Sequence, residues 1–138
     1  MTNRIRINTH GGPMPERHGD WIDLMAADTV VMRKGSYMVI PLGVSMELPS
    51  GCFALVLPRS STFSRYHILM ANSVGVIDNA YCGDGDIWGF PAYAVQDTII
   101  QKGTRIAQFT ICNGADVEFE QVDSLGNEDR GGFGSTGK

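Results

Sequence analysis

The sequence lacks a surplus of basic residues. Its 138 residues include 11 Lys and Arg against 15 Asp and Glu, which gives a net charge of −4. Proteins that bind nucleic acids through the phosphate backbone carry a stripe of Lys and Arg, so the composition argues against direct nucleic-acid binding. An anionic ligand would instead need individually placed arginines, backbone N–H groups or a metal ion.

Cysteine is scarce, and long apolar runs are missing. The only cysteines are Cys52, Cys82 and Cys112, an odd number without CxxC spacing. This fits neither a zinc site nor a disulfide framework and indicates free thiols in a reducing compartment, so we expect a cytoplasmic protein. No apolar run approaches the roughly 20 residues of a membrane span. Arg4 and Arg6 interrupt the N-terminus, where a signal peptide needs an apolar stretch.

Turn residues are abundant, with 17 glycines and 6 prolines. Short β-prone segments recur between them at a spacing of about ten residues, which is typical of a sandwich or barrel. The length indicates a single domain. Residues 10–20 are expected to form a loop. The expected strands cover residues 4–7, 29–32, 37–40, 44–48, 53–57, 87–93, 98–100, 105–112 and 117–122.

The segment Gly75–Asp84 combines a β-prone start with polar residues that can do chemistry. Val76 and Ile77 favour a strand, and the carboxylate of Asp78 and the ring of Tyr81 follow. The pattern predicts a strand that runs into a hairpin with Asp78 at its mouth. Exposed backbone N–H and C=O groups there can read the edge of a flat polar ring. The ordinary alternative is an Asp that only caps a turn.

Two further places carry polar groups of interest. Asp23 lies between two apolar residues and should face the opposite side of its strand, with a solvated strand face as the alternative. Pro58 ends a strand, and the hydroxyl run at residues 60–62 is a good helix N-cap, so residues 62–70 are predicted as the one helix. Arg59 beside a helix N-terminus suggests an anion site, with an ordinary cap and a surface arginine as the alternative.

The C-terminal segment, residues 126–138, is rich in glycine and has Phe133 as its one aromatic residue. Such a segment does not hold itself in place. Residues 132–138 match most of the phosphate-binding pattern GxxxxGK, but the strand before it and the helix after it are not expected here. We therefore predict a β core over residues 1–125 and a flexible lid over residues 126–138. Glycine N–H groups in the lid can still wrap a phosphate, together with Arg130, Ser135 and Thr136.

Five blocks of the sequence resemble, in order, the trimeric deoxyuridine triphosphatase (dUTPase) family. They are Asp23-Leu24-Met25-Ala26, Pro58-Arg59-Ser60-Ser61, Asn72 to Asp78 with Tyr81 and Gly83-Asp84, Gly103 to Gln108, and Arg130 to Gly137. Each block alone is a weak signal, whereas five in order across nearly the whole chain are a strong one. The resemblance implies an all-β, jelly-roll-like barrel with one short helix and a flexible C-terminal tail. It also implies a homotrimer whose three active sites each draw on all three chains.

The resemblance further implies an activity and a role for each matched residue. The expected reaction is hydrolysis of dUTP to dUMP and pyrophosphate by Mg²⁺-assisted attack of water on the α-phosphate, which keeps uracil out of DNA and supplies dUMP for thymidylate synthesis. Asp78 would deprotonate the water, Tyr81 would exclude a 2′-hydroxyl, and Asp23 would support the magnesium through water. The implied substrate contacts are Asn72, Gly75, Val76, Ile77 and Phe133 at the uracil, and Arg59, Ser60, Ser61, Gln108, Arg130, Gly134, Ser135 and Thr136 at the phosphates.

The sequence also departs from the family pattern. Thr104 stands where the fourth block usually has Asp, which leaves any carboxylate role there in doubt. The fifth block is short after Arg130, so Trp88 or Phe90 is a second candidate for the lid over the uracil.

Two alternatives to a dUTPase remain open at this point. The run at residues 59–61 also occurs in dCTP deaminases, which use a Glu on the strand after the hairpin. Residues 86–95 contain Asp86 and no Glu, which counts against deamination. The non-enzyme alternative is a regulatory protein of the same fold that binds nucleotide and signals to a partner protein.

Overall fold

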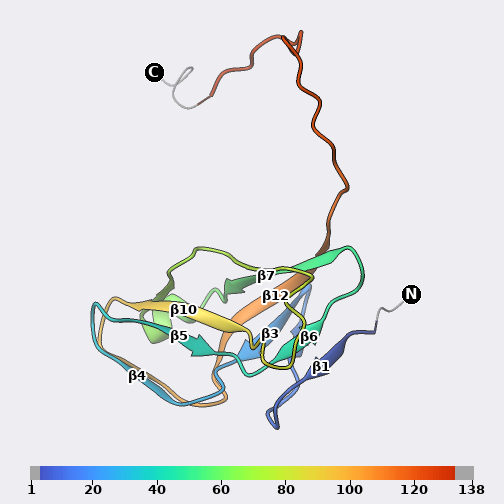
Figure 1. The fold of residues 1–138 in the computed structure, drawn as a ribbon. Coiled ribbons are helices and arrows are strands. Elements are labelled where there is room, and N and C mark those ends of the chain that lie inside the picture. The colour runs from blue at the N-terminus through green and yellow to red at the C-terminus, as the bar shows by residue number, and fades with distance from the viewer. Residues whose placement is uncertain (1–3, 133–138) are drawn as a thin grey trace.

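Residues 4–132, which the computed structural model describes, form strands β1 to β12 and one short helix, α1 (Figure 1). The elements in chain order are β1 (Arg6–Asn8), β2 (Glu16–His18), β3 (Trp21–Met25), β4 (Val30–Met32), β5 (Tyr37–Pro41), β6 (Ser45–Glu47), β7 (Cys52–Pro58), α1 (Thr62–Tyr66), β8 (Ile68–Met70), β9 (Gly75–Ile77), β10 (Gly89–Ala94), β11 (Thr98–Ile100) and β12 (Arg105–Asn113).

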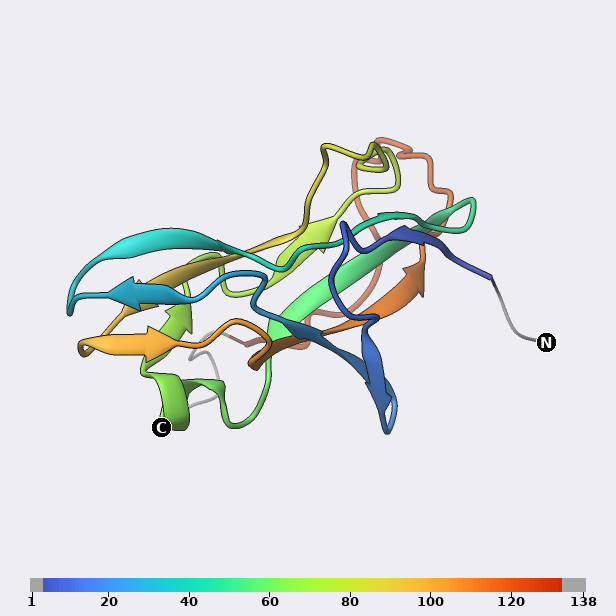
Figure 2. The same ribbon diagram turned by 90° about the horizontal axis from the view of Figure 1, so that it is seen from below.

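The strands divide into four antiparallel sheets rather than one closed barrel. The largest has the order β2-β3-β12-β7-β9, a second has the order β5-β10-β8, and two pairs are β1-β6 and β11-β4. Figure 2 shows these layers from a second direction. The prediction of a nearly all-β, jelly-roll-like fold with one short helix is confirmed.

The sheets share one core because their strands alternate between inward and outward side chains. On β7 the inward residues include Ala54 and Val56, and on β10 they include Phe90 and Ala92. The core also holds Trp88, whose ring meets Phe109 of β12 edge to face with centroids 5.1 Å apart. Its indole Nε1 has no hydrogen-bond partner among residues 4–132.

Trp88 and Phe90 are wrong as candidates for the lid. Their exposed fractions are 1% and 0%, so both rings are needed inside the protein and neither can cover a ligand at the surface.

Several predicted elements differ from the structure. The loop expected over residues 10–20 contains β2, which pairs with β3. The helix ends at Tyr66 because His67 adopts a left-handed conformation, with φ of 57°, and residues 68–70 leave it to pair with β10. The strand expected over residues 117–122 is absent from the described chain, and Phe119 there is 98% exposed.

The predicted hairpin at residues 75–84 is also wrong in part. The strand exists as β9, but it pairs only with β7 and forms an edge of the largest sheet. The residues after it form turns instead of a returning strand.

No helix in residues 4–132 is long and apolar enough to cross a membrane.

Candidate active site

The first half of the site lies on one face of the largest sheet, where β12 runs between β3 and β7. Gln108 of β12 is directly opposite Asp23 of β3 and Leu57 of β7. Directly opposite residues in a sheet point to the same face. Asp23 and Gln108, which are far apart in sequence, therefore share one face, and Arg59 follows two residues after Leu57.

A β-bulge brings Arg105 to the same face. Arg105 pairs with Met25 and Ala107 with Leu24, so Ile106 is an extra residue on β12. In a regular strand residues 105 and 108 would point to opposite faces, but one inserted residue reverses the alternation. Arg105 consequently joins Gln108 beside the carboxylate of Asp23.

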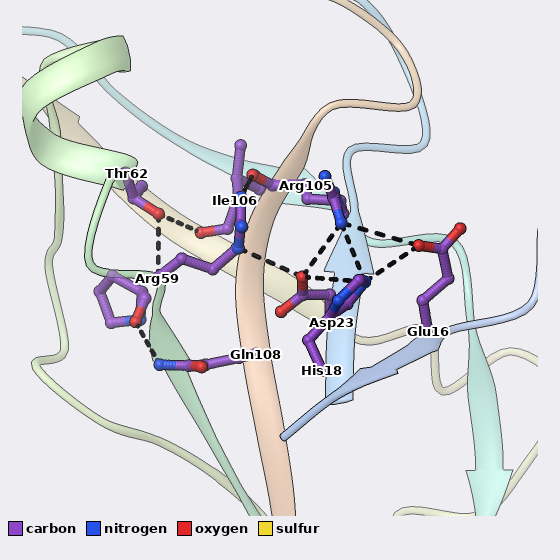
Figure 3. A network of polar contacts seen from close by, with 9 residues as sticks. Glu16, His18, Asp23, Arg59, Thr62, Arg105, Ile106 and Gln108 are labelled. Carbon is purple, nitrogen blue, oxygen red and sulfur yellow. Dashed lines mark hydrogen bonds and ion pairs between the residues drawn. The ribbon is translucent and has the colours of Figure 1, made fainter. Parts of the chain in front are cut away.

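Asp23 is a buried carboxylate surrounded by cationic groups, as Figure 3 shows. Its side chain is 4% exposed, and its Oδ2 lies 3.3 Å from Nε of Arg59 and 3.7 Å from Nη1 of Arg105. None of these contacts is aligned as a hydrogen bond to Oδ2. A buried charge is tolerated only when opposite charges compensate its desolvation. Asp23 therefore does not lie on a solvated strand face, and Oδ2 retains the capacity to accept a hydrogen bond.

Arg59 is fixed by the buried hydroxyl of Thr62. The backbone N–H of Arg59 donates to Oγ1 of Thr62 at 2.9 Å, and that hydroxyl donates to the carbonyl of Ile106 at 2.7 Å. Nη1 of Arg59 donates to the carbonyl of Arg105 at 3.2 Å. The loop before α1 is thus tied to the bulge of β12, and the guanidinium is held over the face that carries Asp23.

The predicted hydroxyl cap of the helix is not formed by the serines. Ser61 is at the cap position but makes no side-chain hydrogen bond there, and Ser60 is exposed in the preceding turn. With five residues, α1 is also too short for a strong dipole, since the dipole sums over aligned peptide units. The positive charge that this loop offers to an anion is therefore that of Arg59, rather than a helix dipole. Close by, Nε2 of Gln108 donates to the carbonyl of Pro58 at 3.1 Å.

The second half of the site is the loop that follows β9. Oδ2 of Asp78 accepts a hydrogen bond from the backbone N–H of Ala80 at 2.9 Å, and the carbonyl of Asp78 accepts one from Tyr81 at 3.0 Å. Asn79 ties the loop down, because its Nδ2 donates to the carbonyls of Pro49 and Cys52 at 2.9 and 2.7 Å. Asp78 does cap a turn, and it is nevertheless exposed on a firmly anchored loop.

Five further predicted residues lie around this loop. The free edge of β9 exposes backbone between Gly75 and Ile77, and Val76 is 65% exposed. Asn72 approaches the start of that edge: a Cβ at Gly75 would lie 3.9 Å from its Nδ2 and 3.2 Å from Cβ of Val56. The ring of Tyr81 is 40% exposed, and its hydroxyl donates to the carbonyl of Ile87 at 3.3 Å.

The two halves are well separated within one chain. Ile77 of β9 pairs with Ala54 of β7, so Asp78 lies beside the start of β7, while Arg59 follows the end of that strand. Six residues along β7 at about 3.3 Å each separate them by about 20 Å. A catalytic base must come within hydrogen-bond reach of the reacting group, directly or through one water. One chain therefore does not bring Asp78 to the arginine cluster.

The tail begins after β12, and the structure describes it as far as residue 132. After Asn113 the described chain runs away from the sheets (Figure 1), and Arg130 is exposed. Four other predicted residues lie outside the described residues. They are Phe133, Gly134, Ser135 and Thr136.

Sequence reasoning missed four residues that the structure places at the first half. Thr62 was considered only as part of a helix cap, and Arg105 only as part of a block. Glu16 and His18 lie in the segment expected to be a loop. Residues 16–18 are all polar and exposed, so no alternation of apolar and polar residues indicates β2 in the sequence.

The donor set at Asp23 suits a hard cation only in part. Within residues 4–132 no group of three or more His, Cys, Asp or Glu side chains could hold a metal ion. Mg²⁺ prefers carboxylate, phosphate and water oxygens and commonly takes only one or two protein carboxylates. Asp23, with an oxygen that accepts no aligned hydrogen bond, fits such a limited role.

Comparisons with known proteins agree on one family. A model described as dUTPase matches residues 14–137. The SPbeta prophage-derived deoxyuridine 5′-triphosphate nucleotidohydrolase YosS of Bacillus subtilis is 55% identical over 120 residues, covering 86% of this chain and 84% of that protein. The deoxyuridine 5′-triphosphate nucleotidohydrolase of Rickettsia massiliae is 34% identical over 139 residues, covering 96% and 93%.

Solved structures show the same likeness. The dUTPase of Staphylococcus bacteriophage 80alpha with dUpNHpp superposes with a TM-score of 0.83 at 25% identity, covering 99% of this chain and 100% of that one. A mutant dUTPase of phage phi11 of S. aureus, which coordinates a structural Mg(II) ion, shares the fold with a TM-score of 0.78 at 22% identity, covering 89% and 99%.

Proposed function

This chain belongs to the dUTPase family and is a deoxyuridine 5′-triphosphate nucleotidohydrolase, and we propose that each of its active sites is assembled from more than one copy of the chain. The observation that supports this proposal is the separation of Asp78 from Arg59 by about 20 Å along β7. The base and the phosphate-binding groups of one reaction have to meet at one substrate. They can do so when the Asp78 loop of one copy faces the arginine cluster of another.

The exposed apolar surface supports the same assembly. In the tail, Val117 and Phe119 are 69% and 98% exposed and alternate with acidic residues, a pattern typical of a strand with one buried face. Exposed apolar side chains in a regular pattern indicate an interface. We propose a homotrimer in which this segment packs on a neighbouring copy and carries Arg130 toward that copy's site.

At the nucleoside end, the loop after β9 would recognise the deoxyuridine. The free edge of β9 from Gly75 to Ile77 and the amide of Asn72 present hydrogen-bonding groups to the edge of uracil. Tyr81, fixed through its hydroxyl, would pack on the deoxyribose and leave no partner for a 2′-hydroxyl. Asp78, held by the N–H of Ala80, would accept the proton of the attacking water, a contribution of roughly 10²–10⁴-fold to the rate.

At the phosphate end, charge must be balanced by local groups because the whole chain is acidic. Arg59 and Gln108 would bind the triphosphate, with the hydroxyls of Ser60 and Ser61 beside them. The lid at residues 126–138 would add Arg130 to the phosphates, with Gly134, Ser135 and Thr136, and place Phe133 on the uracil.

Magnesium is the proposed cofactor, and Asp23 is the residue that would hold it through water. When bound to the triphosphate, Mg²⁺ offsets phosphate charge and polarises the phosphoryl oxygens. The contribution of the chain is the buried carboxylate of Asp23 and the two arginines beside it. We also propose a cytoplasmic location, in keeping with three free cysteines.

One assay tests the activity against its alternatives. Release of pyrophosphate should be measured with dUTP, dCTP, UTP and dTTP, together with release of ammonia from dCTP. We expect pyrophosphate from dUTP and little from the others. Ammonia from dCTP would instead favour a deaminase, and nucleotide binding without turnover would favour a regulatory protein.

A further inference from the structure

Strand β2 brings two side chains from outside the five family-like blocks onto the face of Asp23. Glu16 of β2 is directly opposite Asp23, and His18 is opposite Trp21. Because opposite and alternate residues share a face, Glu16 and His18 both point to the side of the arginine cluster, while Arg17 points away from it. The tight turn at Gly19, with φ of 69°, sets this register.

His18 makes the shortest side-chain contact of Arg105 in the cluster. Nη1 of Arg105 lies 2.9 Å from Nε2 of His18, and 3.7 Å from Oδ2 of Asp23 and from Oε2 of Glu16 (Figure 3). A guanidinium has donors and no acceptor, so in this contact Nη1 of Arg105 donates and Nε2 of His18 accepts. Nε2 of His18 also lies 3.2 Å from Oε2 of Glu16, and that carboxylate is 3.7 Å from Nη1 of Arg105.

Two arginines, Arg59 and Arg105, lie beside the same buried carboxylate oxygen, Oδ2 of Asp23. Arg59 is the nearer partner of Asp23 at 3.3 Å, and Arg105 stays at 3.7 Å. Arg105 is 40% exposed, so without a lateral acceptor its side chain is free to move onto Asp23 or toward Glu16. Either movement changes which guanidinium faces an incoming anion. The imidazole of His18 is the group that prevents it.

We propose that His18 is a positioning residue of the triphosphate site and acts through Arg105. By accepting from Nη1, it keeps Arg105 beside Asp23 and leaves Arg59 in the orientation that receives phosphate. This inference rests on the proposed function, because it takes the ligand of the cluster to be a nucleoside triphosphate. It adds a residue on β2 that none of the five blocks contains.

The test compares variants of His18 for binding rather than for turnover alone. His18→Leu and His18→Ala remove the acceptor, whereas His18→Gln places an amide oxygen close to the position of Nε2. Arg17→Gln is the matched control, since Arg17 is on the same strand, points away from the cluster and donates to the carbonyl of Gly19 at 2.9 Å. Calorimetry on the full chain should measure Kd for a non-hydrolysable dUTP analogue and for dUMP, and a melting curve should record stability.

We expect the Leu and Ala variants to weaken binding of the triphosphate analogue by about tenfold, which is typical of losing a group that orients a ligand-binding side chain. Binding of dUMP, the melting temperature and the Arg17→Gln control should stay near wild type, and His18→Gln should recover most of the affinity. In an Arg105→Gln background, His18→Leu should have no further effect, because the two residues act as one unit.

Three results would overturn the inference. They are wild-type affinity for the analogue in the Leu and Ala variants, equal losses for the analogue and dUMP, and a full His18→Leu effect in the Arg105→Gln background. The proposed function fails separately, if the wild-type chain releases no pyrophosphate from dUTP.

Discussion

Asp78 combines an exposed carboxylate with a fixed orientation. Its Oδ2 accepts from the N–H of Ala80, and an Asn at this position can accept the same hydrogen bond through its side-chain oxygen. Asp78→Asn should therefore keep the loop and remove only the basicity. We expect kcat to fall by about 100-fold or more, since general bases contribute 10²–10⁴-fold, with affinity for a non-hydrolysable dUTP analogue nearly unchanged. Single-turnover hydrolysis and calorimetry measure the two quantities. Turnover near the wild-type rate would exclude Asp78 as the base.

The hydroxyl of Tyr81 is held by a hydrogen bond while its ring is partly exposed, so the ring can distinguish sugars by their shape. The hydroxyl donates to the carbonyl of Ile87, and the ring is 40% exposed. If the ring packs against C2′ of the sugar, UTP should be a far poorer substrate than dUTP by kcat/KM. Tyr81→Ala should narrow that difference, while Tyr81→Phe, which keeps the ring, should preserve it. An unchanged ratio in Tyr81→Ala would disprove the assignment.

At the scale of single elements, the sequence predicts strands better than it predicts how they end and pair. Residues 98–100 were expected as a strand and form β11. The helix was predicted too long because nothing in the pattern shows that His67 adopts φ of 57° and that residues 68–70 gain more by pairing with β10. Strand β2 was missed because glycine and proline around it dominate a local reading, whereas its stability comes from pairing with β3.

The sequence predicts which residues belong to the candidate site, but not how they are arranged in space. Asp23 and Gln108 emerge from the sequence as separate candidates, and only the register of β3 and β12 shows that they are opposite each other. Arg105 reaches their face through a bulge, and a bulge changes the side-chain alternation without a clear sequence signal. The role of Thr62, whose hydroxyl accepts from the N–H of Arg59, could not be predicted from the sequence either, because the hydroxyl donates to a carbonyl on the distant strand β12.

The lid is the element whose removal tests its role most directly. Residues 126–138 carry little apolar surface, and ordering them costs roughly 1–2 kcal/mol per residue, so only ligand contacts can compensate for closure. Deleting residues 129–138 should leave the melting temperature without ligand almost unchanged, because the described part of this segment, residues 129–132, is exposed and outside the core cluster. Turnover of dUTP should collapse, since closure completes the phosphate contacts and excludes water.

A milder variant serves as the control for the lid. Phe133→Ala should lose less activity than the deletion, because it removes stacking and keeps Arg130 and the hydroxyls. If the truncated protein hydrolyses dUTP close to the full-length rate, the tail is not a lid.

At the scale of the whole molecule, the proposed base Asp78 and the arginine cluster of one chain are about 20 Å apart along β7. The largest sheet presents the arginine cluster near one end of β7 and the Asp78 loop near the other. In the proposed trimer with closed cyclic symmetry, the Asp78 loop of each copy can face the arginine cluster of the next copy around the ring. Light scattering should then give about three times the chain mass of 15.0 kDa.

Mixed assemblies test the shared site itself. Asp78→Asn and Arg59→Ala should each be nearly inactive when expressed alone, because every site then lacks one essential group. If Asp78 and Arg59 of a site come from different copies, a mixed trimer contains sites that take Asp78 from the Arg59→Ala chain and Arg59 from the Asp78→Asn chain. Every trimer that contains both chains has one intact site in three, so about a third of wild-type kcat should return in the mixed trimers. Co-expression with two different affinity tags, followed by tandem purification and a pyrophosphate-release assay, measures this recovery.

The control is a chain that carries both substitutions, expressed alone, which should stay inactive. If the mixed trimers are as inactive as the single variants, both residues belong to the same chain's site, and the 20 Å separation along β7 would have to close by a rearrangement within one copy.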